Sequence, residues 1–189
     1  MNYKDLFQQV WALLLSPGKA WAEISDRGAG REIMPDFVYP LIGLCGLAEF
    51  VGAFIGEDIS PDVFQIALTR CCALAVALFG GFFLSTYLLY KCSRLLAGTR
   101  LPYDALMVLV GYSMVVKLAV DIVSAFVAID LIGFILQIYT VVIVFEGSRR
   151  WLKISDDRVG GFTVAATVAV LLCPFVIEFI FNKFSVILS

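Results

Sequence analysis

The sequence predicts an all-α polytopic membrane protein, a bundle of five transmembrane helices preceded by short amphipathic helices at the membrane interface. Its 189 residues are 61% hydrophobic and only 16% charged, and the mean hydropathy is +0.93. Soluble domains stay near about 45–50% apolar, and apolar runs approaching the ~20 residues of one crossing recur along this chain. We therefore expect a single membrane domain over residues 34–183.

Residues 1–33 are predicted to form cytoplasmic helices that precede this domain. Apolar side chains recur there at the spacing of one helix face, and this helix either lies in the membrane interface or packs against the bundle as a cap. A second helix is expected to follow, with Ser16 as its cap and Pro17 as its first residue, Trp21 and Ile24 on one face, and an end near residues 26–30. The apolar face of the first helix consists of Tyr3, Leu6, Phe7, Val10, Trp11 and Leu14.

The third and fourth spans come from one stretch, residues 103–145, which is too long for a single crossing. We expect the turn between them at Asp130 to Gly133, because glycine bends readily and aspartate tolerates water. A turn nearer Asp121 to Ser124 is the alternative. Pro174 should kink the last span. The five predicted spans are residues 36–56, 71–90, 103–128, 131–146 and 160–181.

Small residues recur along three of these spans, where they let neighbouring backbones approach closely. They predict tight packing, and any ridge left over would suit a homodimer. The five cysteines lack the spacing of a disulfide framework, so we interpret them as small packing residues. The ridges are Gly52 and Gly56 in the first span, Ala73, Ala77 and Gly81 in the second, and Gly161, Ala165, Ala169 and Cys173 in the fifth.

The basic residues predict the orientation. In a five-span topology, the N-terminal segment holds four Lys and Arg residues, the loop after the second span three and the loop after the fourth span four. The opposite side holds only Arg70 and Lys183. Because Lys and Arg accumulate in cytoplasmic loops, we expect the N-terminus in the cytoplasm and the C-terminus across the membrane.

Four charged residues in the spans are the candidate site. Lys117 and Asp121 stand one helical turn apart and suit an ion pair; a lone charge at mid-bilayer costs at least ~2.5–3.5 kcal/mol. Glu49, Lys117 and Glu178 lie roughly 18–25 Å beyond the cytoplasmic start of their spans, counting about 1.5 Å per residue, and Asp121 lies further out still. One interpretation is a hydrated pocket that opens outward and binds a cation, a lipid headgroup or a proton.

The other interpretation, which we favour, gives these residues no ligand. Lys117 then pairs with Asp121, while Glu49 and Glu178 bond to the backbone or stay protonated. Side chains near the outer surface also reach water by extending toward it. No metal can be assigned from the pattern.

The composition argues against several functional classes. Histidine is absent, so no Ser/His or Cys/His pair is available for catalysis and no catalytic residue is predicted. We find no phosphate-binding glycine motif and no basic surface, so neither a cofactor nor a nucleic acid is expected. We interpret the chain as a non-enzymatic scaffold in the lipid bilayer that contacts a membrane-protein partner or a second copy; a small transporter or ion-binding permease is the alternative.

Two short motifs and the predicted topology point to a family. Gly111-Tyr112-Ser113 lies within the third span, and Leu14-Leu-Ser16-Pro17-Gly-Lys-Ala-Trp21-x-x-Ile24 precedes the first. In these features, over about residues 10–185, the chain resembles the YIP family, the Ypt/Rab-interacting membrane proteins, particularly its compact bacterial members. The resemblance implies five spans in a bacterial cytoplasmic membrane. The Asp-Leu-Tyr-Gly-Pro-type motif of eukaryotic members has no match here, so a role with Rab GTPases is not carried over.

Overall fold

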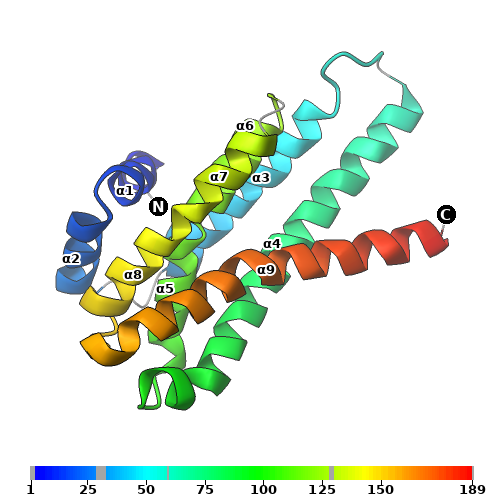
Figure 1. Ribbon diagram of the computed structural model, residues 1–189. Helices are drawn as coiled ribbons and strands as arrows, with labels where there is room; N and C mark the ends of the chain where they lie inside the picture. Colours follow the sequence, from blue (N-terminus) through cyan, green and yellow to red (C-terminus); the bar gives the residue numbers. More distant parts are fainter. Residues whose placement is uncertain (1–2, 29–32, 59, 128–129, 189) are drawn as a thin grey trace.

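The computed structural model describes residues 3–28, 33–58, 60–127 and 130–188, and all regular structure in these ranges is helical (Figure 1). This confirms the predicted all-α class. The elements are α1 (Tyr3–Leu15), α2 (Pro17–Arg27), the π-helical turn η1 (Met34–Val38), α3 (Tyr39–Gly52), α4 (Pro61–Ala97), α5 (Tyr103–Ser113), α6 (Val115–Ser124), α7 (Asp130–Ile138), α8 (Thr140–Arg150) and α9 (Asp156–Leu188).

Within the described ranges, four helical segments are long and apolar enough to cross a membrane. The predicted fourth span is not among them, because it is divided into α7, with 9 residues, and α8, with 11. The two helices meet at Tyr139, and neither reaches the length of one crossing alone. The four candidate spans are Met34–Gly52, Pro61–Ala97, Tyr103–Ser124 and Asp156–Phe181.

The predicted turn between the third and fourth spans is wrong. Asp130 and Gly133 both lie inside α7, while α6 already ends at Ser124, beside the alternative turn. Gly133 serves close packing instead of bending: a Cβ atom there would lie 2.9 Å from Cγ1 of Val120 on α6. The side chain of Asp130 lies outside the part of the chain that the structure describes. Arg31, one of the four basic residues counted in the N-terminal segment, lies outside it as well.

Local capping signals, more than hydropathy, set the ends of α4. The helix begins at Pro61 and ends at Ala97, so it is longer at both ends than the predicted span. Ser60 caps its start, because the Ser60 hydroxyl accepts a hydrogen bond of 3.3 Å from the backbone nitrogen of Val63. Gly98 ends it in the left-handed conformation, with φ 79°. α9 also exceeds its predicted span and continues through Pro174 to Leu188.

The second N-terminal helix is confirmed. α2 begins at Pro17 and is followed by Gly28 in the left-handed conformation, and Trp21 and Ile24 are buried on one face. Ser16 occupies the cap position, although its side chain makes no capping hydrogen bond. The indole nitrogen of Trp21 donates a hydrogen bond of 2.9 Å to the carbonyl oxygen of Ile143, which ties α2 to α8.

The first N-terminal helix uses two apolar faces. Leu6 and Leu13 of α1 are buried in the core, so the helix packs against the rest of the protein. Tyr3, Phe7 and Trp11 are spaced one turn apart on its outer side, and they are 64%, 51% and 60% exposed. Of the two alternatives for this helix, packing against the bundle is therefore present. The helix also exposes a stripe of aromatic side chains, which suits a membrane interface.

α4 and α9 form the most extensive helix contact in the bundle. They cross at Gly81, where a Cβ atom would lie 2.6 Å from Cα of Pro174. The Ser85 hydroxyl donates a hydrogen bond of 2.8 Å to the carbonyl oxygen of Ala169 near the same crossing. Gly81 of the predicted ridge in the second span therefore packs against α9, whereas Gly161 at the start of α9 faces open space.

The cysteines serve packing only in part. Cys45 and Cys173 are buried, and the Cys45 thiol donates a hydrogen bond of 3.3 Å to the carbonyl oxygen of Leu118, which joins α3 to α6. Cys72 and Cys92 are exposed on α4, contrary to the prediction. All five are free thiols.

α7 and α8 run alongside α5 and α6 in the opposite direction. Gly133 in α7 lies beside Val120 of α6, and a Cβ atom on Gly147 in α8 would meet Leu109 of α5 at 2.5 Å. Just beyond α8, the indole nitrogen of Trp151 donates a hydrogen bond of 2.9 Å to the carbonyl oxygen of Ala105. The pair α7–α8 therefore follows nearly the whole length of α5–α6.

Candidate functional site: a charged cavity among four helices

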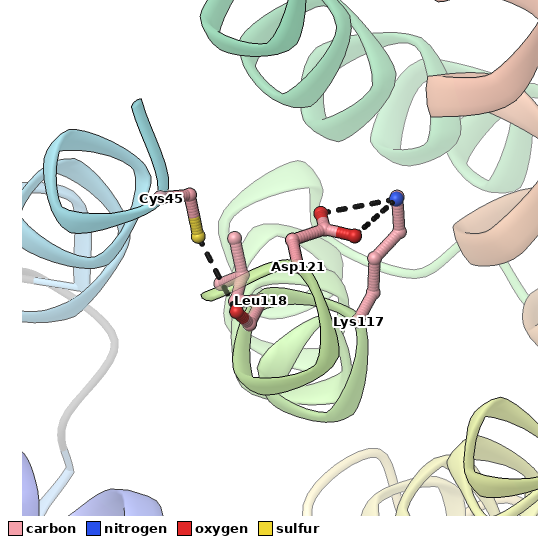
Figure 2. Close-up of polar contacts among 4 residues, drawn as sticks. All are labelled: Cys45, Lys117, Leu118 and Asp121. Atoms are coloured by element: carbon pink, nitrogen blue, oxygen red, sulfur yellow. Dashed lines mark hydrogen bonds and ion pairs between the residues drawn. The ribbon is translucent and has the colours of Figure 1, made fainter. Parts of the chain in front are cut away.

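Lys117 and Asp121 form the predicted ion pair on α6. The Lys117 ammonium lies 3.0 Å from Oδ1 and 3.1 Å from Oδ2 of Asp121, and the side chains are only 12% and 14% exposed (Figure 2). Figure 2 also shows the Cys45 thiol reaching from α3 to the backbone of Leu118 on the same helix. The α3–α6 contact thus fixes the rotation of α6 and places the ion pair.

The four predicted site residues line one cavity of about 420 Å³. α3 contributes Glu49, α6 contributes the Lys117–Asp121 pair and α9 contributes Glu178. α4 adds Arg70. The full lining is Glu49, Thr69, Arg70, Ala73, Leu74, Lys117, Asp121, Ser124 and Glu178.

The cavity holds three carboxylates and two cations, and not all of them are paired. Glu49 and Glu178 are partly buried, and Arg70 is exposed. None of these three makes an ion pair within 4.0 Å or a hydrogen bond with any residue that the structure describes. The predicted ion pair between Lys117 and Asp121 is therefore present, while Glu49, Glu178 and Arg70 line the same cavity without a partner among the described residues.

Buried side chains lie on one side of the cavity. One to two turns away from the charged residues, toward the start of α3, α6 and α9 and the end of α4, the side chains belong to the buried core. Cys45 is 0% exposed, Met114 and Ala77 are each 1% exposed, and Cys173 is 6% exposed. Each of these segments therefore contributes a buried side chain beneath the charged groups.

A second cavity, of about 640 Å³, lies between α1, α2, η1 and Tyr112 of α5. The sequence alone did not predict this cavity, because it does not show which segments face the polar side of α1. The signal available was the cluster of Asp5, Gln8 and Gln9 on that face. The lining is Asp5, Gln8, Gln9, Ala12, Ala20, Glu23, Ile24, Arg27, Gly28, Ile33, Asp36 and Tyr112.

The Gly111-Tyr112-Ser113 motif forms the junction beside this second cavity. A Cβ atom on Gly111 would lie 2.7 Å from Cδ1 of Ile33, so the glycine allows the chain before η1 to approach α5. The Tyr112 ring packs edge to face against Trp21, at 5.7 Å between centroids, and Phe37, at 4.7 Å. Ser113 is fully buried, and its hydroxyl has no hydrogen-bond partner among the described residues.

Comparison with known proteins identifies the family of this helical bundle. The family model described as the Yip1 domain matches residues 11–177. No curated protein and no solved structure matches the chain. The matched region includes α2, the Gly111-Tyr112-Ser113 motif and nearly all of the charged cavity; of the nine lining residues only Glu178 follows it. Because the match covers most of the sequence, the chain belongs to the Yip1 domain family.

Proposed function

We propose that the protein crosses the membrane five times, with its N-terminus in the cytoplasm and its C-terminus outside, in a bacterial inner membrane. In this topology the fourth crossing is the pair α7–α8, which follows α5–α6 from Val120 to Ala105 although a break at Tyr139 divides it. A segment that runs alongside a spanning helix over most of its length is expected to cross the same layer, which supports this count. The aromatic stripe of α1 then lies in the cytoplasmic interface.

The topology predicts that reporters at the two ends face different compartments. A fluorescent protein fused before residue 1 should fluoresce in the cytoplasm, and alkaline phosphatase fused after residue 189 should be active outside it, because an odd number of crossings separates the ends. Phosphatase fused after residue 99, in the loop between α4 and α5, is the matched negative control. Activity of that control, or two ends in one compartment, would contradict five spans.

We infer that the protein is a non-enzymatic interaction scaffold that binds its partner on the cytoplasmic side. The observation that supports this role is the open cavity of about 640 Å³ beneath α1 and α2, with Tyr112 of the family-like motif in its wall. Its charged lining comprises Asp5, Glu23, Asp36 and Arg27, and Arg27 already pairs with Glu23 at 3.4 Å. An excess of carboxylates favours a basic segment of a partner, because complementary charge guides association.

Site-specific cross-linking tests the scaffold. A photo-reactive residue at Gln8, which is exposed and lines this cavity, should capture a defined partner in cells, and one in the basic loop at Arg149 should capture it too. The same residue at Glu57, on the opposite side of the proposed topology, should not. Failure to capture any protein from both cytoplasmic positions would argue against the scaffold.

A small permease is the second candidate, because five charged side chains converge in the outer cavity. The buried turn beneath them favours binding without passage. We therefore expect proteoliposomes containing the wild-type protein to show ion flux no greater than protein-free vesicles, and the single variants Glu49→Gln, Lys117→Met, Asp121→Asn and Glu178→Gln to leave it unchanged. A measurable wild-type flux that two of these variants abolish would establish the permease instead.

A further inference from the structure

The outer cavity presents unpaired groups of both signs. Glu49 on α3 and Glu178 on α9 are partly buried acceptors without donors, and Arg70 on α4 is a donor without an acceptor among the described residues. In the proposed topology these groups lie at the outer leaflet, where unpaired charge is unfavourable. An occupant that supplies both a cation and an anion would satisfy all three.

Simple ions fit this arrangement poorly. A metal cation would pair with Glu49 and Glu178 and leave Arg70 unpaired. A free phosphate would pair with Arg70 and place more negative charge beside two carboxylates, which repel it. The cavity volume of about 420 Å³ falls within the roughly 300–1,000 Å³ typical of small-molecule sites, so a larger, zwitterionic group can enter.

We propose that this cavity binds the phosphoethanolamine headgroup of a phospholipid from the outer leaflet. The ammonium group donates hydrogen bonds to Glu49 and Glu178, and the phosphate accepts hydrogen bonds from the Arg70 guanidinium. The Lys117–Asp121 pair, which also lines the cavity, stays intact when the headgroup binds. The proposal goes beyond the scaffold role and depends only on the proposed orientation of the cavity.

The lining favours a primary ammonium over choline. Quaternary ammonium groups bind in aromatic cages, and none of the residues that line this cavity is aromatic. Carboxylate oxygens accept hydrogen bonds from N–H donors, which the ethanolamine ammonium has and choline lacks.

The surroundings favour a lipid as the source of this headgroup. Phe175 and Phe179, on the same helix as Glu178, are 63% and 55% exposed, and they offer apolar surface for acyl chains.

Lipid binding to the full-length purified protein tests the proposal. Native mass spectrometry with added dioleoyl phosphatidylethanolamine and phosphatidylcholine should show about tenfold tighter binding of the ethanolamine lipid, as expected when charge-assisted hydrogen bonds are made by one headgroup alone. Glu49→Gln with Glu178→Gln should remove this preference. Arg70→Gln should weaken both lipids alike, because both carry phosphate. Glu57→Gln, an exposed carboxylate outside the cavity, is the matched control and should retain the preference.

Three results would overturn the proposal: equal binding of the two lipids, a preference that survives the double glutamine variant, or competition by soluble O-phosphoethanolamine as strong as that by the lipid, which would identify a water-soluble ligand. If the double variant does not fold, Glu178→Gln alone tests the same contact. If the reporter fusions place the two termini in opposite compartments but the protein shows no preference for the ethanolamine lipid, this inference is rejected while the five-span topology is retained.

Discussion

Replacing Lys117 with methionine is expected to destabilise the protein by about 3 kcal/mol, near the lower end of the range for breaking a buried ion pair. Methionine keeps most of the length of the side chain but removes the charge, which leaves the Asp121 carboxylate only 14% exposed and without its partner. The free energy of unfolding, measured by SDS titration in mixed micelles, reports the loss. The loss of stability arises from the buried Asp121 carboxylate that is left without a partner. The intact ion pair contributes little net stability, because burying both charges costs most of what their attraction gains.

The double variant Lys117→Met with Asp121→Leu separates these two causes. Without either charge, the free energy of unfolding should return to within about 1 kcal/mol of the wild-type value, because apolar replacement of a buried pair is often neutral. Lys19→Met removes an exposed lysine and should change stability by less than about 0.5 kcal/mol. A double variant as unstable as the single one would show that Lys117 acts through packing and not through Asp121.

Local patterns predicted the helices of this protein better than their ends. Hydropathy identified the apolar runs, but the start of α4 follows the Ser60 cap and the division of α7 from α8 occurs at Tyr139, where neither glycine nor proline marks it. Gly133 was misinterpreted because glycine suits both a bend and a close helix contact. Only the position of Val120 on the neighbouring helix decides between the two.

The candidate site shows the same division between local and distant information. The Lys117–Asp121 pair follows from spacing on one helix, so the sequence alone identified it. Whether Glu49 and Glu178 face the same cavity as this pair depends on how α3, α4 and α9 are rotated about their axes. The contact of Gly81 with Pro174 and the bond from Cys45 to Leu118 help to set those rotations, and no sequence periodicity encodes them. The α1–α2 cavity was missed for the same reason, since Tyr112 and Asp36 form its far wall.

Replacing Gly81 with alanine is expected to destabilise the protein by about 2 kcal/mol, within the range for overpacking a filled core. The new Cβ atom would lie 2.6 Å from Cα and 2.7 Å from the nitrogen of Pro174, and backbone atoms cannot move aside as the tip of a side chain can. α4 and α9 would have to separate at their crossing, which is the largest helix contact of the bundle. SDS titration in mixed micelles measures this loss.

Gly43→Ala provides the matched comparison, because it makes the same change inside a helix, in α3, where nothing lies within 4 Å of the added Cβ atom. Alanine should stabilise that position by about 0.5–1 kcal/mol, since it restricts the unfolded chain and favours the helix. The two substitutions are therefore expected to have opposite signs. Equal effects would mean that intrinsic helix preference decides both, and that the α4–α9 crossing does not require a glycine.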